Sequence, residues 1–128
     1  MKTIQHLVLF ASFLFACSAG HAATRVVAPG NSIQATINAS STGDLIVVLP
    51  GTYDEDLEID KMLTLIGNGT TSSIINGTGT TNTDAVKITA DWVNLSGFKI
   101  KNSGRNGIFI EESDYVTISG NNVTDSVL

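Results

Sequence analysis

The chain has 128 residues, with seven basic and twelve acidic side chains, a net charge of −5 at pH 7 and 42% hydrophobic residues. This length predicts a single domain, and the high aliphatic content with few charges favours a folded chain over a disordered one. An acidic chain without a basic stripe argues against a nucleic-acid partner, whose phosphates require positive charge.

The first 22 residues have the order of a secretory signal. Lys2 precedes an apolar run of eleven residues, 7–17, and the small residues Gly20 and Ala22 occupy the two positions that a signal peptidase reads. Eleven apolar residues are too few to span a bilayer, which needs about 20. We predict cleavage after Ala22 and a mature domain over residues 23–128 that is secreted, periplasmic or on the cell surface, with no transmembrane segment. The alternative is a lipoprotein processed at Cys17, because residues 14–17 are similar to a lipobox.

Cleavage after Ala22 removes both histidines and the only cysteine, His6, His21 and Cys17. The mature chain then has no disulfide and no imidazole or thiolate ligand for zinc or copper. The acidic run 54–60 has oxygen ligands of the kind that calcium prefers, but it lacks the glycine spacing of calcium loops, which favours a solvated corner. We predict no metal and no other cofactor.

A repeat of 22 to 23 residues occupies the second half of the chain, where 85–97 matches 107–120. Apolar residues alternate within each copy, and one inserted residue, Ser113, lengthens the second copy. The matched pairs are Val86 and Ile108, Ile88 and Ile110, Val93 and Val116, Leu95 and Ile118, and Ile100 and Val123. A weaker copy lies upstream at Leu57, Ile59, Leu63, Leu65 and Gly67.

Alternation with period two predicts short strands with one buried face. Stacking of such units buries a continuous aliphatic column, which none of them could form alone. We predict an all-β fold, a right-handed parallel β-helix of about four rungs, because parallel crossovers are almost always right-handed. The Thr/Ser/Gly/Asn-rich stretch 67–84 is interpreted as a loop between rungs.

The segment before the repeat predicts a short capping helix. Asn31 or Ser32 can cap the apolar pattern of residues 32–39, and 41–44 then turns the chain into a strand at 45–49 that Pro50-Gly51 ends. A helix over the first rung would cover that end of the core. The last rung has no such cover, so we expect a β-helix that is incomplete at its C-terminus, a fragment of a longer protein.

Equivalent positions of successive rungs form rows on the surface. One row contains Met62, Trp92 and Tyr115, and the row before it contains Lys61, Asp91 and Asp114. If the neighbouring valines point inward, the two aromatic rings point outward beside two carboxylates. Asp91, Trp92, Asp114 and Tyr115 are therefore our candidate carbohydrate-facing row.

Two other interpretations of these rows remain open. The aromatic residues can simply stabilise neighbouring strands while Lys61 neutralises Asp91. The two acids also suit the spacing of a glycosidase pair, but acids at any row position would do so. We assign no catalytic residue. Five Asn-x-Ser/Thr sequons suit an exported, glycosylated protein: Asn38, Asn68, Asn76, Asn94 and Asn122.

Several motifs resemble the NosD-type family of periplasmic, copper-associated β-helix proteins and their relatives among prokaryotic surface proteins. They are 32–39, Gly43-Asp44, Pro50-Gly51-Thr52-Tyr53, 63–67 and 90–98. The resemblance implies a pectin-lyase-like right-handed β-helix of the carbohydrate-binding and sugar-hydrolase type. The first half is also similar to the start of pectinesterases, although no residue here matches their catalytic Gln, Asp and Arg.

Three functional hypotheses follow. The first is a non-catalytic extracellular module that faces polysaccharide or neighbouring surface proteins. The second is the N-terminal fragment of a polysaccharide lyase, hydrolase or pectinesterase-like enzyme. The third is an accessory protein for copper delivery, for which the mature chain lacks histidine and cysteine ligands.

Overall fold

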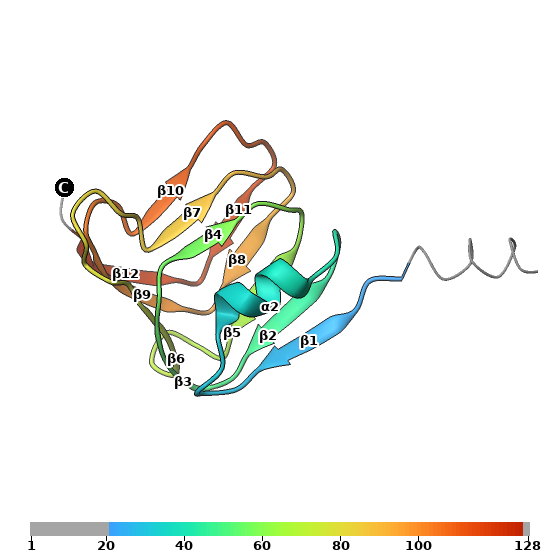
Figure 1. Cartoon of the computed structure of the whole chain (residues 1–128), viewed down its shortest axis with the longest axis horizontal. Helices are drawn as coiled ribbons and strands as arrows, with labels where there is room; N and C mark the ends of the chain where they lie inside the picture. The colour runs from blue at the N-terminus through green and yellow to red at the C-terminus, as the bar shows by residue number, and fades with distance from the viewer. Residues whose placement is uncertain (1–20, 127–128) are drawn as a thin grey trace, which may run out of the picture.

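The computed structural model describes residues 21–126, which form a β-solenoid of about four turns (Figure 1). Three parallel sheets run along it. The five-stranded sheet contains β1 (Thr24–Val27), β2 (Leu45–Val48), β5 (Thr64–Gly67), β8 (Asn94–Ser96) and β11 (Thr117–Ser119). The four-stranded sheet contains β3 (Gly51–Asp54), β6 (Ser73–Asn76), β9 (Lys99–Ser103) and β12 (Asn122–Ser126). The three-stranded sheet contains β4 (Leu57–Ile59), β7 (Val86–Ile88) and β10 (Ile108–Ile110).

The strand register confirms the predicted repeat. Val86 pairs with Ile108, and Leu95 pairs with Ile118, so the insertion at Ser113 is absorbed between the two sheets. Val86, Ile88, Val93 and Leu95 are all fully buried in one aliphatic core. The alternation therefore marks the inward side chains of a parallel β-solenoid, as predicted.

The helix α2 (Ile33–Ala39) lies beside the first turn, next to β4 (Figure 1). Ser32 is its N-cap and accepts a hydrogen bond from the backbone N–H of Ala35, as predicted. Ile33 and Ile37 are buried in the core. The carboxylate of Glu55 accepts hydrogen bonds from the Ser32 hydroxyl and the Ile33 N–H at 2.7 and 2.6 Å. The helix therefore closes this end of the apolar column.

Three features differ from the sequence-based expectation. The strand over 45–49 ends before Pro50 as expected, but a further strand that was not expected, β3, begins directly at Gly51, so each complete turn contains three strands. The stretch 67–84 is not all loop, since β6 lies within it and Ile75 enters the core. An additional strand, β1, precedes the helix and pairs with β2. Short strands in Thr/Ser/Gly-rich sequence give too little alternation to be recognised alone.

The last turn leaves part of its inner row open to solvent. Ile110, Ile118 and Val123 are 42%, 36% and 43% exposed, although they pair with buried residues of the turn before. No helix among the described residues is long and apolar enough to cross a membrane. The proposed signal, with the alternative lipidation site at Cys17, falls almost entirely outside residues 21–126.

Candidate functional site

The two predicted aromatic residues stack on the outer surface of the solenoid. The ring centroids of Trp92 and Tyr115 are 4.1 Å apart and their planes differ by 9°. The side chains are exposed, at 56% for Trp92 and 68% for Tyr115. One face of the Trp92 ring is therefore occupied by Tyr115, and Tyr115 is the more exposed residue of the pair.

The backbone at both aromatic residues is left-handed, with φ of 61° at Trp92 and 58° at Tyr115. Gly43 is at the equivalent corner of the first turn and has φ of 92°. Glycine or asparagine adopts this conformation at lower cost than a bulky side chain does. The two aromatic residues therefore hold a conformation that their own chemistry disfavours, and the stacking of their rings offsets part of that cost.

The two acids of the predicted row support this corner. Asp91 accepts a hydrogen bond from the backbone N–H of Asp114 at 2.8 Å, and the Trp92 N–H donates to the Asp114 carbonyl at 3.0 Å. Lys61 does not pair with Asp91, so that expectation was wrong. Its ammonium group instead donates to the carbonyls of Asn38 and Ser40 at the end of α2, where a cation is favoured.

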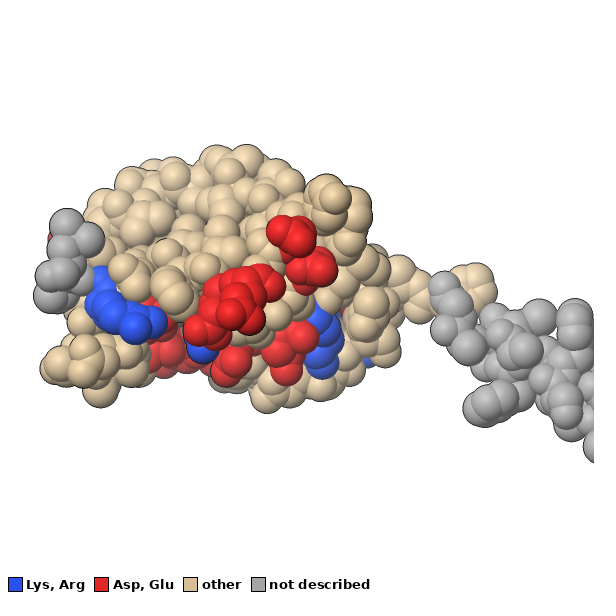
Figure 2. Space-filling view, turned by 90° about the horizontal axis from the view of Figure 1, so that it is seen from above, with Lys and Arg blue, Asp and Glu red and all other residues tan. Residues whose placement is uncertain are grey.

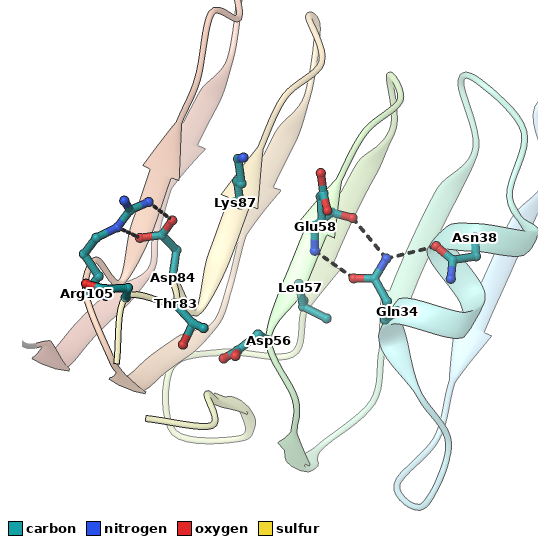
Figure 3. A pocket seen from close by; sticks show the side chains of 10 residues that line it. Gln34, Asn38, Asp56, Leu57, Glu58, Thr83, Asp84, Lys87 and Arg105 are labelled. Carbon is teal, nitrogen blue, oxygen red and sulfur yellow. Dashed lines mark hydrogen bonds and ion pairs between the residues drawn. The ribbon is translucent and has the colours of Figure 1, made fainter. Parts of the chain in front are cut away.

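A second surface feature, which sequence analysis did not predict, is an open groove of about 580 Å³ across the three-stranded sheet (Figure 3). It runs from α2 past β4 and β7 to the segment before β10. Its lining is mainly polar and charged, and consists of Gln34, Asn38, Asp56, Leu57, Glu58, Asn82, Thr83, Asp84, Lys87 and Arg105. The groove combines residues from four successive turns.

One end of the groove is formed by an ion pair. Arg105 donates from Nε and Nη2 to the two carboxylate oxygens of the buried Asp84, at 2.9 and 2.5 Å (Figure 3). The Arg105 guanidinium and the amide of Asn106 hold the pKa of Asp84 below its usual range, against the effect of burial. The guanidinium also lies 4.8 Å from the centre of the Phe109 ring. These contacts fix Arg105 at the rim.

Lys87, on β7, lies in the middle of the groove. The half-buried Lys87 forms an ion pair with the exposed Glu111 at 2.9 Å, and this contact raises the Lys87 pKa. At the other end, the side-chain amide of Gln34 pairs with the backbone of Glu58 (Figure 3). The groove is thus lined by amide, carboxylate and ammonium groups, several of which are paired with a neighbouring turn.

The acidic run is distributed among separate structural contacts. Glu55 caps α2, Asp54 accepts from the Asn76 amide at 2.6 Å, and Asp56 accepts from the Thr78 N–H and hydroxyl. Figure 2 shows acidic side chains gathered in a band on one face, with basic side chains beside it. Within residues 21–126, however, no three His, Cys, Asp or Glu side chains come together as a metal site.

Comparisons with known proteins agree with this architecture. No family model matches the chain. The chain is similar to the cell surface glycoprotein of Methanothermus fervidus, with 38% identity over 96 residues, which is 73% of this chain and 16% of the glycoprotein. It thus spans about one sixth of that relative's length. Among solved structures it is similar to the alginate lyase of Paenibacillus sp. str. FPU-7, with a TM-score of 0.71 and 20% identity, covering 81% of this chain and 37% of the lyase. At this identity the likeness shows a shared β-solenoid fold.

Proposed function

We propose that this chain is an extracellular, non-catalytic β-solenoid module of a cell-surface protein. The observation that supports it most is the similarity to a cell surface glycoprotein across most of the described solenoid. The signal-like residues 1–22 and the five sequons agree with export. Within this fold, the motifs named above favour a member similar to NosD-type proteins.

The proposal is tested by locating the protein on cells. An antibody raised against the purified solenoid should label intact cells of the source organism, and mild external protease should remove the label. Deletion of residues 2–22 should retain the protein inside the cell. Label that appears only after permeabilisation would contradict a surface location.

A second candidate function is carbohydrate binding at the aromatic row, defined by Asp91, Trp92, Asp114 and Tyr115. Exposed aromatic rings contact the C–H faces of sugars, and neighbouring carboxylates accept hydrogen bonds from hydroxyls. The stacked pair is exposed, and the Tyr115 ring is the more accessible of the two. The polar groove beside β4 and β7 provides a second surface for the same class of ligand.

Affinity electrophoresis in gels that contain alginate, pectin or another acidic or neutral polysaccharide tests this function. Retardation should be weakened by Tyr115→Ala and Trp92→Ala. The matched control is Met62→Ala, which removes an exposed side chain from the same row one turn earlier. Equal retardation of all three variants would exclude the aromatic row as the binding surface. Release of unsaturated or reducing products by the unmodified chain would favour the enzyme hypothesis instead.

Copper delivery, the third hypothesis, would require ligands other than histidine and cysteine in the mature chain, because His6, His21 and Cys17 precede the predicted cleavage site. A copper site needs several nitrogen, sulfur or carboxylate ligands at one point. Residues 21–126 contain no cluster of three such groups. A copper titration of the signal-free protein tests this hypothesis, because a saturable, stoichiometric site would support it.

A further inference from the structure

Asp44 is a buried carboxylate immediately before β2, with 1% of its surface exposed. The backbone N–H of Thr64 donates a hydrogen bond to the Asp44 carbonyl. One turn later, the backbone N–H of Asn94 donates the equivalent hydrogen bond to the Leu63 carbonyl. Asp44 therefore occupies a position where the later turns have the buried apolar residues Leu63 and Val93. A charge at such a position is costly unless it is paired and hydrogen-bonded.

Three groups supply that pairing. Arg25 Nε and the Ser41 N–H donate to Oδ2 of Asp44 at 3.0 and 2.9 Å. The donor to Oδ1 is the backbone nitrogen of Ala23, at 2.8 Å. Because this last donor is a main-chain atom, its charge depends on whether the chain continues before it.

Ala23 is also the first residue after the predicted signal. Its carbonyl accepts a hydrogen bond from Leu45 N–H at 2.9 Å, which holds it beside β2. His21, Ala22 and Ala23 are exposed and belong to no strand, so the peptide bond between Ala22 and Ala23 is accessible to a peptidase. The predicted cleavage site and the buried carboxylate are therefore adjacent in space.

We propose that hydrolysis of the Ala22–Ala23 bond creates an α-ammonium group that pairs with Oδ1 of Asp44 and completes the N-terminal end of the solenoid. A signal peptidase breaks the C–N bond, and water adds hydroxyl to the Ala22 carbonyl carbon and a proton to the Ala23 nitrogen. The new acid at Ala22 ionises, and the amine takes up a proton. A neutral N–H donor thus becomes a full cation without moving.

The resulting site has one anion between two cations. The ammonium group faces Oδ1, while Arg25 from β1 binds Oδ2. Lys61, from the following turn, contacts the carbonyls of Asn38 and Ser40 instead. Direct contact with Asp44 raises the pKa of the new amine above that of a free chain end. The ion pair therefore stabilises the folded protein fully at pH values below the ordinary pKa of a chain-end amine. This stabilisation is lost as pH rises through the higher pKa that the amine has in the folded protein.

The experiment begins with export of the full chain and purification of the mature protein. Its intact mass should correspond to a chain that starts at Ala23, and any other N-terminus would overturn the proposal. A variant with Gly-Ser inserted between Ala22 and Ala23 keeps the signal and the cleavage position. After processing, its Ala23 nitrogen is an amide again, which makes it the matched control.

The insertion variant should unfold about 4 °C lower than the mature protein at about pH 6, and the two should converge at about pH 10. Equal unfolding temperatures at the lower pH would overturn the proposal. Asp44→Asn should abolish the difference between the two forms, and a difference that persisted would overturn it. If Asp44→Asn does not fold, the pKa of the Ala23 amine is measured by NMR titration of the unmodified mature protein. An amine pKa that is not raised would contradict the ion pair. Neither experiment depends on carbohydrate binding or on surface location.

Discussion

Gln34 forms two hydrogen bonds with the backbone of Glu58, using both ends of its side-chain amide. Its Oε1 accepts from the Glu58 N–H at 2.7 Å, and its Nε2 donates to the Glu58 carbonyl at 3.1 Å. Glu58 lies in β4, one of the two edge strands of the three-stranded sheet. A glutamine on a helix thus pairs with an edge strand as another strand would, which protects that edge from association.

Gln34→Leu should lower the free energy of unfolding by about 1 kcal/mol, because it leaves both backbone groups of Glu58 without this partner. Urea denaturation gives the value. Asn38→Ala is the matched control, because it removes the Gln34–Asn38 contact alone and leaves the Glu58 backbone paired. A loss from Asn38→Ala as large as that from Gln34→Leu would contradict this assignment.

The buried acids Asp44 and Asp84 make the protein sensitive to acid. The N–H groups of Ala23 and Ser41, with Arg25, lower the pKa of Asp44 to about 2, and Arg105 chiefly lowers that of Asp84. Because both pKa values are lower in the folded protein, the contacts of the two carboxylates stabilise it fully above the aspartate pKa of the unfolded chain, about 3.9. This stabilisation is lost as pH falls through the pKa values of the folded protein.

We therefore expect the unfolding temperature to fall between about pH 4 and pH 2. Asp84→Asn should make this fall shallower by removing one of the two acids. Circular dichroism measures the unfolding temperature of each protein across this pH range. An Asp84→Asn curve parallel to that of the unmodified protein would show that the ion pair with Arg105 contributes nothing.

Gly67 is required by the close approach of two turns. A Cβ at this position would lie 2.4 Å from the Gly97 carbonyl oxygen and 2.9 Å from the buried Phe98 ring. Gly67→Ala should therefore destabilise the protein by about 3 kcal/mol, since backbone atoms cannot move aside as a flexible side chain can. Gly120→Ala, in the last turn, would place its Cβ more than 4 Å from any atom outside the two adjacent residues, so only the left-handed backbone, with φ of 61°, disfavours alanine there. It should cost about 1 kcal/mol, and a larger loss than at Gly67 would contradict the steric explanation.

The stacked rings should be energetically coupled. A double-mutant cycle of Trp92→Ala and Tyr115→Ala should give a coupling energy of about 1 kcal/mol in urea denaturation. Trp92→Ala and Asn122→Ala give the matched cycle, since Asn122 is exposed on another sheet. That cycle should be additive, and additivity of the aromatic cycle as well would mean that the stack contributes no stability.

The sequons differ in how accessible they are. Asn38, Asn68, Asn94 and Asn122 are exposed, whereas Asn76 is half-buried and its amide donates to Asp54. If the native cells glycosylate the protein, peptide mass spectrometry should find glycans at exposed sites and none at Asn76. Modification of Asn76 in the presence of unmodified exposed sites would contradict this order.

The alternating pattern predicted the strands correctly where successive turns have similar lengths. The pairs Val86 with Ile108 and Leu95 with Ile118 repeat at nearly constant spacing, so their alternation reveals both the strands and the buried side. It failed at β6, where Ile75 is the only fully buried aliphatic residue of a polar segment. Short polar strands are specified by their neighbours in the stack and not by their own composition.

The two candidate surfaces also differ in whether the sequence could predict them. The aromatic row was predictable because Trp92 and Tyr115 hold matching places in adjacent repeats. The groove was not, because Gln34, Glu58, Lys87 and Arg105 come from a helix, two strands and a loop whose separations in sequence follow no period. The buried role of Asp44 was equally hidden, since an acid in an otherwise apolar row interrupts the pattern that identifies the row.

The extra residues between β6 and β7 leave the pairing on both sides unchanged, with Leu57 opposite Val86 and Ile75 opposite Ile100. The base of this excursion is held by Asp56 and Thr78 on one side and by Asp84 and Arg105 on the other. Its tip, the turn at Thr81 and Asn82 that the Thr83 N–H closes onto the Thr80 carbonyl, is exposed. A foreign peptide grafted there would be displayed from the side of the molecule at little cost to the scaffold, which makes this tip the natural point for an engineered epitope.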